Sequence, residues 1–597
     1  MKENLLKGLL AKYSIIEIEN AAIKLFLKNN KIKKLKNKLI KNRITSINFE
    51  IYNVIEKNFD IVTINSLDKF FENLFNEKEK EENGIVFTPD FIANYIVENT
   101  IEYFDDNTKI IDPSCGCGIF LISAIKYIKE KKHIPFKNII KNNLYGIDLQ
   151  SNNIDKVKIL ISLYAITNNE DLEEYEFNLK CCDSLFSDWK KVFNIESFDY
   201  IIGNPPYINN HDLKDEYIEN LKRTFETTKE GVFNIFYAFI EKSAYTLSDT
   251  GKIGYIIPNN FLHIKSAERL RQFIKNNKLL NTIIDFKDNT VFSHVLTYNS
   301  IIFLNKNNSL FKYAQIKKTN SIDSILNNIK FEEKDISQLD DNGWILSDDK
   351  IIKNIKIIES YNKIDLYIKT GIATLRDKLF ILDGFDEEKQ LYFKTLDDTK
   401  YYIEKEITKP FIKISKYKVS NNIERIIFPY KLENNKAIVY SEKYLEKNFP
   451  LCFKYFNDNK RKIEKKDKDK ILKPWYVYGR SQGLNLFDKK LIFSTFNLVP
   501  EFMDCPTNDA LLSNGYCITN FPYSKKVLLK ILNSNIMKYY IENTSYSISG
   551  DYKCFQKKYI KNFSIPEIND EISNKIISLD GEELDKYLCK LYKLDDF

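Results

Sequence analysis

Residues 198–208 read Phe-Asp-Tyr-Ile-Ile-Gly-Asn-Pro-Pro-Tyr-Ile, an apolar strand pattern that runs into a polar and aromatic loop. Pro205 and Pro206 have a fixed φ and no N–H, so the segment cannot continue as a helix or a central strand. The carboxamide oxygen of Asn204 and the carbonyl of Pro205 are two acceptors that can bind both hydrogens of one NH₂ group. Tyr207 supplies a flat face for a planar ring. The loop therefore predicts a site for an exocyclic amine on a planar heterocycle.

A glycine-rich turn upstream argues against an ordinary proline turn, which is the alternative for the Asn-Pro-Pro-Tyr loop alone. Residues 110–118 read Ile-Ile-Asp-Pro-Ser-Cys-Gly-Cys-Gly and are followed by apolar residues at helical spacing. A strand, a glycine turn and a helix in this order bring backbone N–H groups close to a ligand. The turn is neither G-x-G-x-x-G nor a Walker loop, so dinucleotide and phosphate binding are weak interpretations.

Polar groups also stand at the ends of two further predicted strands. Residues 144–148 read Leu-Tyr-Gly-Ile-Asp and end in Asp148, a carboxylate of the kind that accepts hydrogen bonds from ribose hydroxyls. A third strand end carries Asp183. Together with Asp112 and Asn204, these groups predict a crevice along the carboxyl edge of a parallel sheet.

The four segments together resemble the S-adenosylmethionine-dependent amino-methyltransferases. Their order is similar to that of the gamma-class N6-adenine DNA methyltransferases of restriction–modification type. Gly84–Pro89, Phe233–Glu241 and Gly251–Asn259 look like further segments of that family. The resemblance covers residues 84–305 with specific motifs, and it extends more loosely over much of the C-terminal half.

The resemblance implies a cofactor, S-adenosylmethionine, and a set of site residues. The implied cofactor-binding residues are Thr88, Pro89, Asp112, Ser114, Gly116, Gly118, Asp148 and Asp183. The implied catalytic residues are Asn204, Pro205, Pro206 and Tyr207. A second aromatic side chain, Phe292, is implied to stack on the target base together with Tyr207.

The chemistry of the loop suits a poor nucleophile such as the adenine amine, whose lone pair is delocalised into the ring. Hydrogen bonds to Asn204 Oδ1 and the Pro205 carbonyl would favour the pyramidal nitrogen that forms as the lone pair localises. A target base in duplex DNA must leave the stack, and stacking on aromatic side chains recovers part of that cost. A cytosine C5 methyltransferase needs a Pro-Cys nucleophile segment, and this sequence has none.

Composition narrows the class of protein. The 597 residues, 43% of them hydrophobic, are enough for two or three domains with their own cores. No apolar run approaches a membrane span and the start lacks a signal-peptide core, so we expect a cytoplasmic protein without a membrane partner. Nine cysteines without C-x-x-C spacing suggest reduced thiols, and four histidines without a ligand cluster predict no metal site.

Basic residues are clustered, which is more informative than a net charge of only +7. Residues 28–43 contain lysine and arginine without one acidic residue, and residues 454–480 are lysine-rich and lead into an aromatic and amide-containing stretch. Such segments suit phosphate and groove contacts, although a solvated surface is the alternative for each. The expected DNA-binding residues are Lys465, Lys466, Lys468, Arg480 and Gln482.

The sequence pattern divides into three parts. Residues 1–80 are expected to form a helical N-terminal extension. Residues 81–310 are expected to form a Rossmann-like α/β methyltransferase catalytic domain, and residues 345–597 a mixed α/β DNA target-recognition domain.

We therefore expect a site-specific adenine DNA methyltransferase that acts on double-stranded DNA, with a separately encoded restriction endonuclease as a candidate partner. Three alternatives stay open. The Asn-Pro-Pro-Tyr loop also serves a protein glutamine N5-methyltransferase, since it suits any planar amide. The chain could instead be the methylating subunit of a multi-subunit restriction system, or a DNA-binding protein with a decayed methylase. The long region after residue 305 favours an added recognition domain and a self-sufficient enzyme.

Overall fold

The computed structural model describes residues 2–74, 87–292, 297–316, 319, 321–341, 343–347, 349–434, 436–464, 474–548 and 551–595. The chain forms two compact units, Met1–Leu346 and Ser347–Phe597. Within the described ranges, no helix has both the length and the apolar character needed to cross a lipid bilayer.

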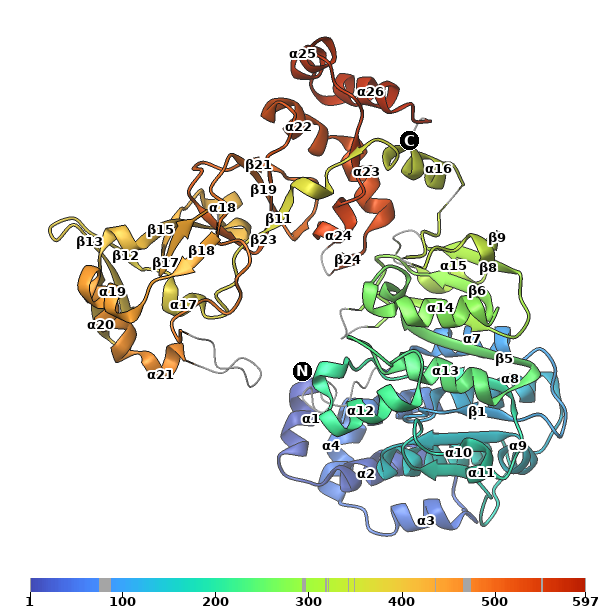
Figure 1. Ribbon diagram of the computed structural model, residues 1–597. Coiled ribbons are helices and arrows are strands. Elements are labelled where there is room, and N and C mark those ends of the chain that lie inside the picture. The colour runs from blue at the N-terminus through green and yellow to red at the C-terminus, as the bar shows by residue number, and fades with distance from the viewer. Residues whose placement is uncertain are drawn as a thin grey trace. The chain divides into compact units, whose positions relative to one another are not determined.

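A nine-stranded sheet forms the centre of the first unit (Figure 1). In spatial order its strands are β3 (Asn178–Cys181), β2 (Leu144–Asp148), β1 (Ile110–Asp112), β4 (Phe198–Gly203), β5 (Leu247–Pro258), β7 (Asn299–Leu304), β6 (Leu280–Asp285), β8 (Leu310–Gln315) and β9 (Glu332–Asp335). The strands from β3 to β5 are parallel, and β7 is antiparallel to both of its neighbours. This confirms the predicted α/β class with a mostly parallel sheet.

Successive residues of the strands face two separate hydrophobic cores, as the period of a strand requires. Ile110 lies in one core and Ile111 in the other, and Tyr200 and Ile201 divide in the same way. The first core is covered by α7 (Asp90–Thr100), α8 (Ile119–Lys131), α9 (Phe136–Asn142), α10 (Ser151–Thr167) and α15 (Ile322–Leu326). The second is covered by α11 (Trp189–Phe193), α12 (Asp215–Thr224), α13 (Phe236–Thr246) and α14 (Glu268–Asn276).

The N-terminal helices pack into the first of these cores. They are α1 (Lys2–Leu10), α2 (Ile15–Asn29), α3 (Lys38–Ile44), α4 (Phe49–Asn58) and α5 (Ile64–Glu72). Their buried residues share one core with α8 and α10. A buried charge cluster adds a second link, because Glu19 contacts Lys156 of α10 at 3.3 Å and Arg43 at 2.5 Å. The N-terminal helices are therefore part of the same compact unit as the nine-stranded sheet.

The register of the sheet brings the predicted strand ends to one edge. Asp112 pairs with Gly146, Asp148 pairs with Cys181, and Gly203 pairs with Tyr255. The carboxyl ends of β1, β2, β3 and β4 therefore lie side by side, as in other open parallel sheets that bind ligands at this edge.

The second unit has a mixed α/β architecture built from small sheets, as the sequence predicts. Its four-stranded sheet consists of β11 (Ile368–Thr370), β23 (Gly515–Thr519), β19 (Lys490–Ser494) and β21 (Met503–Asp504). Its three-stranded sheets are β12 (Gly384–Asp386), β13 (Leu391–Leu396) and β14 (Thr399–Ile403); β16 (Glu424–Ile427), β15 (Thr408–Lys413) and β22 (Leu511–Ser513); and β20 (Phe496–Asn497), β25 (Tyr552–Cys554) and β24 (Ser547–Ile548). Its principal helices are α16 (Asp349–Ile358), α19 (Glu442–Asn448), α20 (Pro450–Asp458), α22 (Lys525–Leu532), α23 (Asn535–Thr544), α25 (Asp570–Ser578) and α26 (Gly581–Tyr592).

Candidate cofactor and active site

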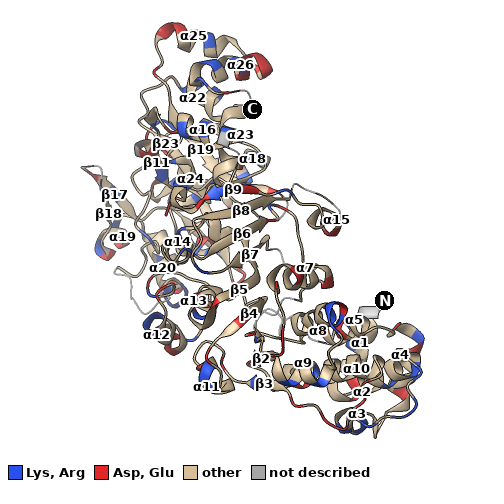
Figure 2. Ribbon diagram, turned by 90° about the vertical axis from the view of Figure 1, so that its right-hand side faces the viewer, with Lys and Arg blue, Asp and Glu red and all other residues tan. Residues whose placement is uncertain are grey.

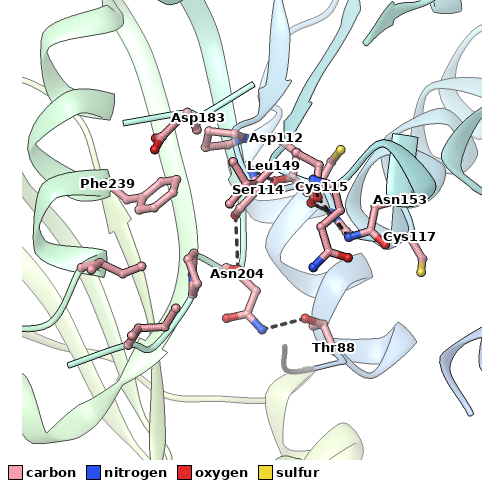
Figure 3. Close-up of a pocket in the computed structure, with 18 of the residues that line it drawn as sticks. Thr88, Asp112, Ser114, Cys115, Cys117, Leu149, Asn153, Asp183, Asn204 and Phe239 are labelled. Atoms are coloured by element: carbon pink, nitrogen blue, oxygen red, sulfur yellow. Dashed lines mark hydrogen bonds between the residues drawn. The ribbon is translucent and has the colours of Figure 1, made fainter. Parts of the chain in front are cut away.

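A cavity of about 610 Å³ lies at the carboxyl edge of β1 to β4 (Figure 3). Its volume is in the range of small-molecule sites. Eight of the residues singled out in the sequence line it: Thr88, Asp112, Ser114, Gly116, Asp148, Asp183, Asn204 and Pro206. The other five singled out for this part of the fold are not among its lining residues: Pro89, Gly118, Pro205, Tyr207 and Phe292.

The glycine turn between β1 and α8 forms one wall of the cavity. Gly118 has a φ of +94°, and a Cβ there would lie 3.0 Å from both methyl groups of Val157. Gly116 has a φ of +51°, with no other group within 4 Å of a Cβ built on it. Both glycines therefore allow a backbone path that other residues rarely adopt, so the turn can approach a ligand closely.

Asp148, at the end of β2, ties two loops of the site together. Its Oδ2 accepts a hydrogen bond from the Gly116 N–H at 2.9 Å. Its Oδ1 accepts from the Gln150 N–H at 2.8 Å and from Asn153 Nδ2 at 3.0 Å. Burial raises the pKa of the Asp148 carboxyl, although these hydrogen bonds oppose the shift. The carboxylate thus holds the glycine turn and the start of α10 in a fixed relation.

Asp112 lies behind the glycine turn and is fully buried. Its Oδ1 accepts a hydrogen bond from the Ser114 N–H at 3.0 Å. Burial raises the pKa of Asp112 to about 8, and the nearby charge of Asp148 adds to the shift. A Cβ on Gly203 would stand 2.8 Å from Asp112 Oδ1, so only glycine lets β4 approach this carboxyl.

Asn204 follows β4 and enters the cavity with a fixed carboxamide (Figure 3). Its Nδ2 donates to Thr88 Oγ1 at 3.1 Å, and its backbone carbonyl accepts from Ser114 Oγ at 3.3 Å. Because the amide nitrogen of Asn204 donates to Thr88, the amide oxygen of Asn204 points away from Thr88. Pro89 is the N-cap of α7, and its carbonyl accepts hydrogen bonds from the N–H groups of Ile92 and Ala93 at 3.0 and 3.1 Å. Residues 84–86, which precede Thr88, lie outside the described residues.

Tyr207 is half-buried, and two hydrogen bonds to its hydroxyl fix the position of its ring. Its hydroxyl donates to the Ile256 carbonyl at 3.0 Å and accepts from Asn299 Nδ2 at 3.3 Å. Its ring meets Phe236 in a T-shaped contact with centroids 6.2 Å apart. Phe292 is only 5% exposed and lies in the first hydrophobic core. The structure does not present the Phe292 ring at the cavity, so its stacking role stays a prediction.

Asp183 stands at the opposite side of the cavity from Cys117 (Figure 3). Its Oδ1 accepts a hydrogen bond from the Leu185 N–H at 2.9 Å, which fixes the turn after β3. Tyr217 and Phe239 also line the cavity and supply apolar surface. Sequence reasoning missed both, since an aromatic residue on a helix is more often part of a core than of a site.

The charge of the residues that line the cavity indicates the kind of ligand that it binds. Among its described lining residues, one is basic, Lys214, and six are acidic: Asp68, Glu72, Asp112, Asp148, Asp183 and Asp212. Buried carboxyls with raised pKa values are stabilised in their charged form by a cation. S-adenosylmethionine carries a sulfonium and an ammonium group, and its ribose and adenine suit Asp148 and the apolar wall. The residues present therefore fit this cofactor.

Comparison with known proteins agrees with the geometry. Residues 142–292 match the model of the Eco57I restriction-modification methylase family. The chain is 26% identical over 610 aligned positions to the type II restriction enzyme and methyltransferase RM.Eco57I of Escherichia coli, which covers 86% of this chain and 60% of that protein. It is 21% identical to the type II methyltransferase M.BstVI of Geobacillus stearothermophilus, over 86% of this chain and 96% of the relative.

Two solved structures share the fold. The type IIL restriction–modification enzyme MmeI in complex with DNA gives a TM-score of 0.59 at 11% identity, over 99% of this chain and 90% of that one. A nuclease-deletion mutant of the type ISP enzyme LlaGI in complex with a DNA substrate mimic gives a TM-score of 0.53 at 15% identity. The match covers 90% of this chain and 49% of that one.

The fold is the one found in these restriction–modification enzymes, and the acidic cavity fits S-adenosylmethionine. The sequence relatives to which the chain is similar are methyltransferases of restriction–modification systems. The chain spans 60% of the length of its Escherichia coli relative.

Proposed function

We propose that this protein methylates the N6 amine of an adenine that is turned out of duplex DNA at a specific sequence. The observation that carries the proposal is the Asn204 carboxamide, which enters the cavity with its nitrogen held by Thr88 at 3.1 Å. Two consecutive prolines keep the Pro205 carbonyl beside it. A carboxamide oxygen and a rigid carbonyl suit both hydrogens of an exocyclic amine.

The bound cofactor supplies an electrophilic methyl group on a sulfonium. Asn204 Oδ1 and the Pro205 carbonyl each accept a hydrogen bond from one N–H group of the amine. They stabilise the positive charge that develops on its nitrogen. Thr88 fixes which end of the carboxamide faces the amine. The ring of Tyr207, held at its edge, offers a face for base stacking. Alignment of this kind contributes about 7–11 kcal/mol in well-oriented reactions.

The product of the reaction tests the proposal. Purified protein is incubated with radiolabelled S-adenosylmethionine and duplex DNA, and the digested DNA is examined for labelled nucleosides by mass spectrometry. We expect N6-methyl-2′-deoxyadenosine from the single chain, and far less of it in the same time from an Asn204→Ala variant. Label on the glutamine of an added protein would favour the glutamine methyltransferase. Label that appears only when a second specificity chain is added would favour a methylating subunit.

The second unit is the proposed reader of the DNA sequence. Gly479 and Arg480 donate backbone N–H groups to Thr374 and Ala373, at 3.0 and 3.1 Å, and so join two loops. Gln482 Nε2 donates to the Gly371 carbonyl at 2.9 Å. No side-chain hydrogen bond or ion pair engages the Arg480 guanidinium within the described parts of the chain. Lys465, Lys466 and Lys468 lie outside the described residues, and their phosphate contacts stay predictions.

The N-terminal basic cluster, residues 28–43, is a weaker candidate for DNA contact. Several of its cations pair with acids of the same unit: Lys28 with Glu56 at 2.5 Å, Lys38 with Glu174 at 3.2 Å and Arg43 with Glu19 at 2.5 Å. Figure 2 shows acidic segments among the basic ones around α3 and α4. The two exposed lysine pairs support a solvated surface for this cluster, and Arg43 belongs to the buried charge cluster around Glu19. The proposal therefore assigns sequence reading to the second unit.

Arg480→Ala is expected to weaken binding to the cognate duplex by about 10- to 100-fold, and binding to a scrambled duplex much less. An arginine that contacts a base edge contributes about 1–3 kcal/mol of discrimination. Arg461→Ala is the matched control. Arg461 is an exposed arginine of the lysine-rich stretch, and the loss of a phosphate contact there should weaken binding to both duplexes alike. Fluorescence anisotropy at several salt concentrations measures both. Equal losses on both duplexes for Arg480→Ala would place sequence reading elsewhere.

A separately encoded restriction endonuclease is the partner that we propose for this enzyme. Support comes from two relatives whose length the chain nearly covers. The alignment covers 96% of M.BstVI, and it covers 94% of M.HincII of Haemophilus influenzae, which is 25% identical to this chain. Both carry the name methyltransferase alone. Incubating unmodified DNA with the purified chain and Mg²⁺ tests this, because cleavage by the chain itself would contradict a separate nuclease.

A further inference from the structure

A carboxylate from the N-terminal helices reaches the cofactor cavity. Asp68 lies on α5, is 4% exposed, and lines the cavity together with Glu72 of the same helix. Its Oδ1 has no hydrogen-bond partner among the described residues. A buried carboxylate oxygen without a partner lowers stability, so native proteins rarely keep one that has no function.

The cations near Asp68 are occupied by other groups. Each of the three neighbouring lysines contacts a different residue: Lys69 with Asp90 at 3.9 Å, Lys126 with Asn65 at 2.7 Å, and Lys156 with Glu19 at 3.3 Å. Their charges lower the pKa of Asp68, but burial and the charge of Asp90 outweigh them and raise it to about 7. None of the described cations forms an ion pair with Asp68.

Asp68 is placed at one end of the cavity. Asp68 and Cys117 both line the cavity, and the charge of Asp68 adds to the effect of burial in raising the pKa of the Cys117 thiol. Figure 3 shows Cys117 and Asp183 on opposite sides of the cavity, with Asn204 between them in this view. A ligand whose ribose meets Asp148 and whose base lies toward Asp183 therefore extends its other end toward Asp68.

We propose that Asp68 binds the α-ammonium group in the methionine part of the cofactor, so that the N-terminal helices complete the cofactor site. The inference rests on the proposed function for the identity of that cofactor. An ammonium group is a compact cation with three donors and no acceptor, and a buried carboxylate is its strongest partner in proteins. This assignment gives the otherwise unpartnered oxygen a ligand, and it explains why a helix before the methyltransferase motifs packs against α8 and α10.

Two ligands that differ only in the amino-acid part test the role of Asp68. S-adenosylhomocysteine carries the ammonium group, whereas 5′-methylthioadenosine keeps the adenosine and the sulfur but lacks the amino acid. In Asp68→Asn we expect the dissociation constant of S-adenosylhomocysteine to rise by about 10- to 100-fold, the loss of one charge-assisted hydrogen bond. The affinity for 5′-methylthioadenosine should stay the same. Isothermal titration calorimetry of the full chain measures both ligands.

Asp90→Asn is the matched control, because Asp90 is a neighbouring acid that does not line the cavity. It should leave both affinities nearly unchanged. Equal weakening of both ligands in Asp68→Asn, or unchanged binding of S-adenosylhomocysteine, would overturn the inference. Failure of the wild-type chain to bind either ligand would instead count against the proposed function.

The wild-type chain offers a second test that does not depend on a variant that folds. Burial raises the pKa of the Asp68 carboxyl, so near neutral pH part of it is protonated and must lose its proton to pair with an ammonium group. Calorimetry in buffers of different ionisation enthalpy should therefore show that S-adenosylhomocysteine binding releases more protons than binding of its desamino analogue. Equal proton release and equal affinity for the two ligands would overturn the inference.

Discussion

Replacing Asn204 by alanine is expected to slow methyl transfer by about 1000-fold while the cofactor binds within a few-fold of its normal affinity. The Asn204 amide nitrogen is held by Thr88 Oγ1 at 3.1 Å, so the carboxamide is oriented before any substrate arrives. Removing it takes away a preorganised acceptor that gains strength only as charge develops on the amine. Such a group contributes to the transition state more than to cofactor binding.

The measurement for Asn204→Ala combines single-turnover transfer of a radiolabelled methyl group to DNA with calorimetric titration of S-adenosylhomocysteine. Asn209→Ala is the matched control, because Asn209 is an exposed asparagine of the same loop that does not line the cavity. It should keep nearly normal turnover. Normal turnover in Asn204→Ala would remove the basis of the proposed mechanism, and a parallel loss of cofactor affinity would show a structural role instead.

Asp148→Asn is expected to raise the dissociation constant of the cofactor by about 100-fold. The two carboxylate oxygens accept backbone N–H groups from Gly116 and Gln150, at 2.9 and 2.8 Å. An amide cannot accept at both positions, so one of its donors would face a backbone N–H. The change also removes a charge from the wall predicted to hold the ribose. A loss of about 3 kcal/mol, the upper value for one charged hydrogen bond, corresponds to this factor.

Calorimetry with S-adenosylhomocysteine and with 5′-methylthioadenosine measures the effect of Asp148→Asn. Both ligands contain the ribose, so both should weaken together, in contrast to the selective loss expected for Asp68→Asn. Asp155→Asn, an exposed acid on α10, serves as the control and should bind both normally. Unchanged affinity in Asp148→Asn would show that the end of β2 does not hold the ribose.

Local sequence patterns were sufficient to predict much of the fold and part of the site. The strands β1, β2 and β4 are short, mostly apolar runs that end in aspartate or glycine. The rule that parallel strands present their carboxyl ends at one edge then brings Asp112, Asp148 and Asn204 together. The structure places all three on one cavity. Chain order and turn chemistry carry this information, because each motif lies within about ten residues of its strand.

Contacts between distant segments were beyond the reach of those patterns. Phe292 has the sequence context of a stacking residue, but its burial in the first core depends on side chains from other elements. Tyr217 and Phe239 occupy helix positions that look like ordinary core, and only the packing of α12 and α13 turns them toward the cavity.

The sequence by itself determined the mostly parallel sheet, the glycine turn and the Asn-Pro-Pro-Tyr loop, because backbone restrictions and hydrophobic period act over a few residues. Only the tertiary structure decided that Asp68 belongs to the cofactor cavity. In the sequence it is one charged residue on an amphipathic helix, 44 residues before Asp112. Its burial arises from the packing of α5 against α8 and α10, and its significance arises from neighbouring lysines that contact other groups. Both depend on surfaces that meet only when the chain is folded.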